Sequence, residues 1–86
     1  MKQLILDGSL GMDAIHDLLA QELTFPHWYG RNLDALYDCL TDLSEDASFE
    51  LVNLDELGFR GRALACVFRD AAHANCHIHL KDGQKP

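Results

Sequence analysis

The sequence predicts an α/β protein with two layers, in which helices cover one face of a three-stranded parallel sheet. The first observation is the order of segments, strand-helix-helix-strand-turn-helix-strand, because helical crossovers favour parallel pairing of the strands they connect. The second is length, since 86 residues support one hydrophobic core. The third is composition: 48% hydrophobic residues with six glycines and two prolines are typical of a globular chain.

The first strand is predicted near Lys2–Leu6, a mostly apolar run that ends at an Asp-Gly turn signal. Apolar residues at helical spacing then predict a helix over Met12–Leu23. His16 is expected at an exposed position of this helix. The helix stops before Pro26, because proline disfavours a helical residue in front of it.

The second helix is predicted after Asn32, which is a favourable N-cap residue. Its apolar stripe consists of leucines at positions 33, 36, 40 and 43. The polar stretch 44–48 predicts a turn, and Phe49–Asn53 predicts the second strand. A single helical turn is expected around residues 55–58.

The third helix is predicted over Arg60–Ala74, where the helical spacing of apolar residues returns. The last strand is predicted near His77–Leu80, within the alternating run CHIHL. Cys76, Ile78 and Leu80 should face inward, with the histidines on the wetter side. One domain is expected over residues 1–81, followed by a C-terminal tail over 82–86.

The net charge of −7 disfavours binding to nucleic acid or anionic lipid and favours a basic partner. Residues 32–59 contain eight acidic side chains and no Lys or Arg: Asp34, Asp38, Asp42, Glu45, Asp46, Glu50, Asp55 and Glu56. A solvated acidic surface that keeps the protein soluble is the plainer interpretation of this cluster.

No run of about 18 apolar residues is present, which argues against a membrane span. Asp7 interrupts the N-terminal apolar run too early for a signal peptide. Together with an odd number of cysteines, three, these features predict a reducing, cytoplasmic setting. The free protein is expected to be a monomer.

The second helix carries its acids where they weaken a helix. Asp34 and Asp38 are four residues apart, and further acids gather at its C-terminal end, where the helix dipole disfavours anions. Such a pattern favours a functional role, namely a rigid array of carboxylates for a cationic partner. Trp28, Tyr29 and Tyr37 add aromatic anchors, although Tyr29 fits the core equally well.

Two other chemistries have less support. Asp34 and Asp38 lie on a convex helix face and not in the concave site that a catalytic pair needs. His73, Cys76, His77 and His79 invite a zinc site, but the strand alternation separates Cys76 from the histidines. We therefore expect no enzyme activity, no metal and no cofactor.

The segment FPHWYGRNLDALYDCLT, residues 25–41, resembles the signature of the barstar family. The resemblance extends more weakly over almost the whole chain, including VFRDA at 67–71 and the cysteine before the last strand. Barstar relatives are small intracellular inhibitors of secreted microbial ribonucleases of the barnase type. Their fold, a three-stranded parallel sheet with helices, agrees with the order of elements predicted here.

The resemblance implies a partner-binding surface whose residues can be carried over one by one. They are Trp28, Tyr29, Gly30, Asn32, Leu33, Asp34, Ala35, Tyr37, Asp38, Thr41 and Asp70. By this resemblance Asp38 takes the place of an RNA phosphate among the enzyme's cations, Asp34 pairs with a second basic group, and Trp28 covers the catalytic histidine. The alternative is an immunity-type module for another basic toxin or nuclease.

This chain departs from the family pattern at several positions. Arg31 places a cation near the rim of the implied surface, where it would repel or re-aim a basic partner. Asp70 is a shorter acid than the glutamate expected there, and Leu43 stands where an aromatic residue can occur. These departures suggest a different cognate enzyme.

Overall fold

The computed structural model describes residues 1–81, and the predicted tail at 82–86 lies outside them. Its strands are β1 (Lys2–Asp7), β2 (Ala47–Val52) and β3 (Ile78–Lys81), and its α-helices are α1 (Met12–Glu22), α2 (Leu33–Thr41) and α3 (Phe59–Ala74). Two 3-10 helices, η1 (Gly8–Leu10) and η2 (Leu54–Leu57), follow the first two strands. Among the described residues, no helix has the length and apolar character needed to cross a membrane.

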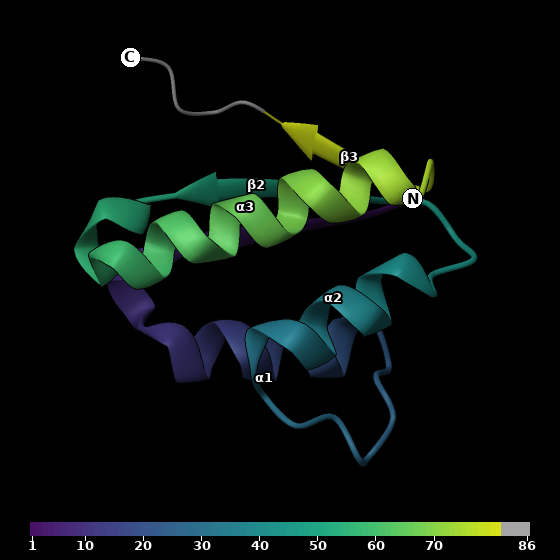
Figure 1. Cartoon of the computed structure of the whole chain (residues 1–86), viewed down its shortest axis with the longest axis horizontal. Helices are drawn as coiled ribbons and strands as arrows, with labels where there is room; N and C mark the ends of the chain where they lie inside the picture. Colours follow the sequence, from purple (N-terminus) through teal and green to yellow (C-terminus); the bar gives the residue numbers. More distant parts are fainter. Residues whose placement is uncertain (82–86) are drawn as a thin grey trace.

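The sheet has the order β1-β2-β3, and both pairs of neighbours are parallel, as predicted. Leu4 of β1 lies opposite Phe49 of β2, and Ala47 of β2 lies opposite Ile78 of β3. The three α-helices lie on one side of this sheet (Figure 1), which confirms the two-layer α/β architecture.

The strand boundaries differ slightly from the prediction. β2 begins two residues early, at Ala47, because its backbone N–H donates to the carbonyl of His77 and extends the pairing (3.0 Å). β3 begins at Ile78, so Cys76 precedes the strand and is exposed, contrary to the expected inward position. Leu80 is also 38% exposed, because β3 is a short edge strand.

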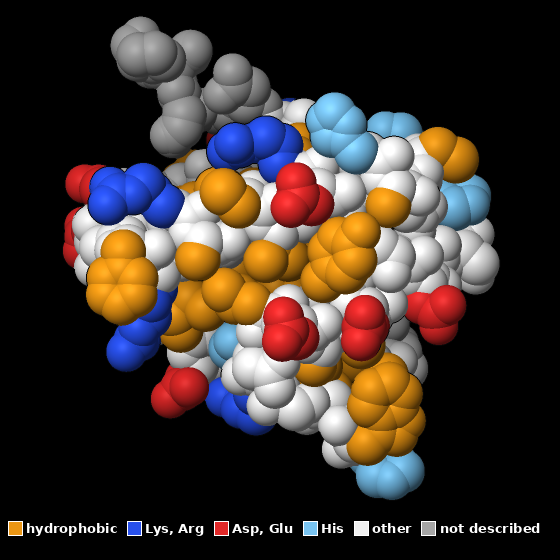
Figure 2. Space-filling model, in the orientation of Figure 1, with side chains coloured by type: hydrophobic (Ala, Val, Ile, Leu, Met, Phe, Trp, Pro, Cys, Tyr) orange, Lys and Arg blue, Asp and Glu red, His pale blue; other side chains and the backbone are white. Residues whose placement is uncertain are grey.

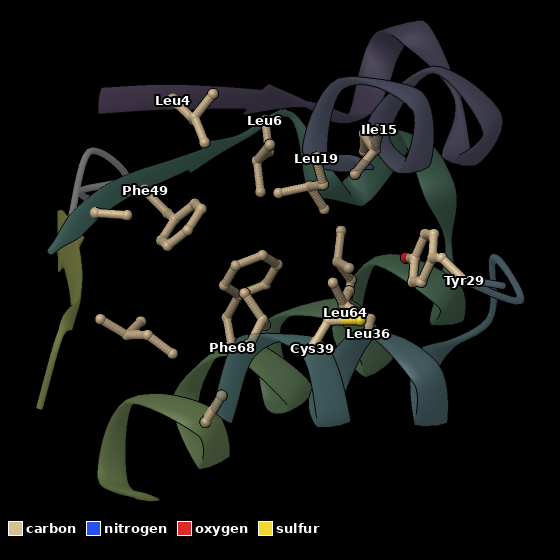
Figure 3. Packing of buried hydrophobic residues seen from close by; sticks show 14 residues of the cluster. Leu4, Leu6, Ile15, Leu19, Tyr29, Leu36, Cys39, Phe49, Leu64 and Phe68 are labelled. Carbon is tan, nitrogen blue, oxygen red and sulfur yellow. The ribbon is translucent and has the colours of Figure 1, made fainter. Parts of the chain in front are cut away.

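The core lies between the sheet and the helices. Leu6, Leu19, Leu36, Phe49 and Phe68 are fully buried and come from five different elements (Figure 3). The rings of Phe49 and Phe68 meet at 4.9 Å between centroids. Each such side chain stabilises the fold by roughly 1.5–3 kcal/mol through burial. The core thus ties α1, α2 and α3 to one face of the sheet.

Two asparagines fix the ends of α2. The Asn32 side chain accepts a hydrogen bond from the Ala35 backbone N–H (2.8 Å), which confirms it as the N-cap. The buried Asn75 side chain donates to the carbonyl of Leu40 in the last turn of α2 (2.9 Å) and to that of Leu43, just past the end of the helix (3.1 Å). Because carbonyls in the last turn lack partners within the helix, Asn75 gives the Leu40 carbonyl a partner and anchors the end of α2 next to β3.

Candidate functional site

The exposed face of α2 carries the predicted carboxylates. Leu36 and Leu40 are fully buried, whereas Asp34 and Asp38 on the opposite side are exposed. The 3.6-residue period of the helix causes this division. Capping at both ends holds the backbone, so the two carboxylates project from a fixed support.

The other sequence-predicted residues on or next to α2 also reach the surface to some degree. Gly30 and Asn32 are exposed, whereas Leu33, Ala35, Tyr37 and Thr41 are partly buried. Thr41 donates its hydroxyl to the Asp38 carbonyl (3.1 Å), within the helix.

The loop before α2, residues 24–32, projects away from the two layers (Figure 1). The Phe25 N–H donates to the Ala20 carbonyl (3.0 Å) and the Tyr29 N–H to the Pro26 carbonyl (2.9 Å). Trp28 lies within the second of these turns, and its side chain is 66% exposed. A large aromatic ring left this open is available for contact with a partner.

Tyr29 points the other way, into the core. Its hydroxyl lies 2.6 Å from Nδ1 of His16, and its ring packs edge-on against Phe25 with 4.9 Å between centroids. Burial raises the pKa of Tyr29 to about 12. Tyr29 therefore supports the loop from below, and its predicted contact with a partner stays untested.

The expectation that His16 is exposed was wrong, because its side chain is buried beside Ile15. Burial, and next the cation of Arg31, lowers the pKa of His16. Helical spacing alone could not show this, because the group that satisfies the imidazole, Tyr29, lies 13 residues further along the chain.

A hollow of about 480 Å³ separates the loop from α2. Trp28 lies on its loop side, and Asp38 and Asp42 lie on its helix side. Apolar and small polar residues complete the lining: Leu23, Thr24, Phe25, Pro26, Cys39, Leu43 and Ser44. Asp38 thus stands between an open helix face and a recess that can accept part of a partner's side chain.

Asp70 is exposed on α3, the helix that packs against α2. Figure 2 shows a hydrophobic strip between these helices with acidic side chains on either side of it. Partly buried apolar residues of the two helices include Leu33, Tyr37 and Val67. Apolar surface ringed by charge is typical of a protein-binding face.

The acidic segment 32–59 does not form one patch. Asp46 lies 2.8 Å from Nδ1 of His77 and 3.7 Å from Nε2 of His79, at the start of the sheet. Its hydrogen bond with His77 lowers the pKa of Asp46. Glu50 is on β2 opposite Lys81, and Asp55 is on η2. Only some of the acidic side chains in segment 32–59 therefore lie on the exposed face of α2.

Within residues 1–81, no group of three or more His, Cys, Asp or Glu side chains is arranged to hold a metal ion. His77 and His79 share the carboxylate of Asp46; His79 lies on β3, whereas His77 and Cys76 both precede the strand. The zinc alternative gains no support from this arrangement.

Two comparisons connect this geometry with known proteins. A family model described as Barstar (barnase inhibitor) matches residues 1–77. A protein of Bacillus subtilis (strain 168) named "Putative ribonuclease inhibitor YrdF" is 51% identical over 43 residues, which are 48% of this chain and 47% of that relative. The match thus spans about half the length of the curated relative.

Proposed function

The chain belongs to the barstar family, and on that premise we propose that it inhibits a ribonuclease of the barnase type by covering the enzyme's basic active site. The face that binds is the acidic side of α2 with the loop 24–32 beside it. Membership in a family of inhibitor proteins means that the chain acts by binding and has no enzyme activity of its own.

The observation that carries the proposal is the position of Asp38. Its exposed carboxylate lies near the middle of a helix capped at both ends and borders the recess opposite Trp28. A ribonuclease holds RNA phosphates with cationic side chains, and a fixed carboxylate can form charge-assisted hydrogen bonds with the same groups. Asp38 therefore takes the place of a phosphate.

The surroundings of Asp38 favour exclusion of water from such a contact. Trp28 on the loop and Tyr37 on the helix supply aromatic surface, and Asp34 and Asp70 supply further acceptors for basic groups. A charge pair enclosed by an aromatic and apolar ring contributes more to affinity than one at a wet rim.

The test is to measure the affinity of wild type and Asp38→Ala for a panel of barnase-type ribonucleases by calorimetry and by inhibition of RNA cleavage. Asp38→Ala should weaken the cognate complex by about 2–5 kcal/mol, the usual cost of truncating one partner of a buried charge pair. Complexes of barstar proteins are among the examples that define this range. The free protein should stay folded, because removing one of two like charges four residues apart stabilises a helix slightly.

Asp46→Ala is the matched control, because Asp46 is also an exposed aspartate but is engaged by His77 away from α2. It should change affinity by no more than about 1 kcal/mol. If Asp46→Ala abolishes binding while Asp38→Ala binds like wild type, the proposed surface is wrong. If wild type binds a basic nuclease outside the panel and none within it, the immunity-type alternative replaces the proposal.

The same proposal includes a 1:1 complex and a cytoplasmic location. All three cysteines, Cys39, Cys66 and Cys76, are free, which supports a reducing compartment. One proposed binding face per chain, formed by α2 and the loop 24–32, supports a single binding site. Light scattering of the purified complex gives the stoichiometry directly.

A further inference from the structure

We propose that Arg31 is a positioning residue that clamps the loop 24–32 onto α1 and so presets Trp28 for binding. This inference deepens the proposed function and rests on it for the consequence on affinity. Its structural half concerns the free protein alone and can be tested without a partner.

The first observation is the set of contacts that Arg31 makes. Its Nη1 donates to the carboxylate of Asp17, and its Nη2 lies 3.6 Å from the Asp13 carboxylate and 3.4 Å from the Asp13 carbonyl. Asp13 and Asp17 are four residues apart, so they stand on the same side of α1. One planar guanidinium thus bridges two successive turns of that helix, a geometry that lysine cannot reproduce.

The second observation is the backbone at Arg31. Its φ is +56°, in the left-handed region that residues with a Cβ seldom adopt. This residue lies between Gly30 and the N-cap Asn32, three positions after Trp28. An unfavourable backbone conformation persists where the surroundings hold it, and the ion pairs to α1 are the contacts that do so.

The third observation is how few polar side-chain links connect the loop to α1. In the described part of the chain there are two: the buried contact of Tyr29 with His16, and the contacts of Arg31 with Asp13 and Asp17. They lie at Tyr29 and Arg31, directly after Trp28, so together they restrain the backbone next to Trp28. The charge of Arg31 is also offset by its own acids, which favours a structural role over repulsion of a basic partner.

The first experiment measures backbone order in the free protein by NMR relaxation. For wild type we expect amide order parameters of about 0.85 over residues 27–31. For Arg31→Ala we expect the order parameters of the same residues to fall toward about 0.6. Asp17→Asn should produce the same loss through the other partner, and the double variant should add little further. Arg62→Ala, which removes an exposed arginine of α3, is the matched control and should leave the loop unchanged.

Two further variants separate the side chain from the backbone. Arg31→Asn suits the left-handed conformation but lacks the reach to α1, so it should loosen the loop as Arg31→Ala does. Exchanging the charges, Arg31→Asp with Asp17→Arg, should restore part of the order. High salt should move wild type toward the variants, because exposed pairs are screened at about 1 M salt.

The second experiment measures affinity for the cognate ribonuclease. Arg31→Ala should raise the dissociation constant roughly 2- to 5-fold, since a loop that must be ordered on binding lowers affinity and the exposed ion pairs are individually weak. Unchanged order parameters in both Arg31→Ala and Asp17→Asn would overturn the clamp. A wild type that binds no ribonuclease would instead refute the proposed function, while the NMR result would still decide the clamp.

Discussion

His16 and Tyr29 form a polar contact inside the core, directly beneath the loop that carries Trp28. A neutral imidazole whose Nδ1 bears no proton can accept a hydrogen bond from the Tyr29 hydroxyl. Burial disfavours the charged imidazolium, and the nearby Arg31 cation adds to this, so the pKa of His16 is lowered from its ordinary value of 6.5. The stability of the loop support therefore depends on pH.

The sign of this dependence follows from proton counting. Below a pH of about 6.5 an unfolded His16 binds a proton that the folded state does not yet bind, so acid favours unfolding. The contribution of neutral His16 to the free energy of unfolding is complete above about pH 6.5, and it is lost as the pH falls through the lowered pKa of folded His16. We expect the free energy of unfolding, measured by urea titration, to fall more steeply between about pH 7 and pH 5 in wild type than in His16→Gln.

The control for this prediction is His73→Gln, which removes an exposed histidine of α3. It separates the loss of the buried His16 imidazole from the loss of an exposed one. Equal slopes for wild type and His16→Gln would show that His16 does not contribute to acid sensitivity.

The backbones of η2 and α3 approach each other closely at Gly61. A Cβ built on this buried glycine would lie 2.0 Å from the Leu54 carbonyl oxygen and 2.9 Å from its carbon. Both atoms belong to the backbone, so neither can rotate away. Glycine is required here for close packing, although alanine is the better helix former.

Gly61→Ala should therefore destabilise the protein by about 1–3 kcal/mol, the usual effect of overpacking. Helix propensity alone would give the opposite sign, a gain of up to about 1 kcal/mol. The free energy of unfolding, measured by chemical denaturation, distinguishes overpacking from helix propensity. The control is Cys66→Ala, at an exposed position of the same helix, whose free energy of unfolding should stay within about 0.5 kcal/mol of wild type. A Gly61→Ala variant more stable than wild type would contradict the close contact with Leu54.

Local sequence patterns predict those features of the elements that depend on residues close together in the chain. The apolar stripe and the Asn32 cap predicted α2 and its acidic face correctly, because both depend on residues within a few turns. The start of β2 at Ala47 depends on hydrogen bonding to the segment that leads into β3. The burial of His16 depends on its contact with Tyr29. Both partners are distant in sequence, so local patterns cannot reveal them. The ties of Arg31 to α1 escaped prediction for the same reason, since charge alone does not say which surface a side chain meets.

Acidic side chains lie on several faces of the molecule, and a docked basic partner is close to only some of them. Asp42 lines the recess next to α2, whereas Glu50 lies on β2 opposite Lys81 of the neighbouring strand. At long range both contribute to the negative field that attracts a basic protein. Close to contact, only charges on the docking side are within a Debye length of the partner, about 8 Å at physiological salt.

This difference gives a prediction about rates that a count of net charge cannot make. Asp42→Asn and Glu50→Gln each remove one negative charge. By stopped-flow fluorescence of Trp28 with the cognate ribonuclease, Asp42→Asn should lower the association rate constant roughly 2- to 5-fold at low salt, with little change in dissociation. Glu50→Gln should lower it much less. At about 1 M salt, where the Debye length is about 3 Å, both variants should associate at the wild-type rate. Equal slowing by the two variants would mean that total charge, and not its arrangement around α2, guides the encounter.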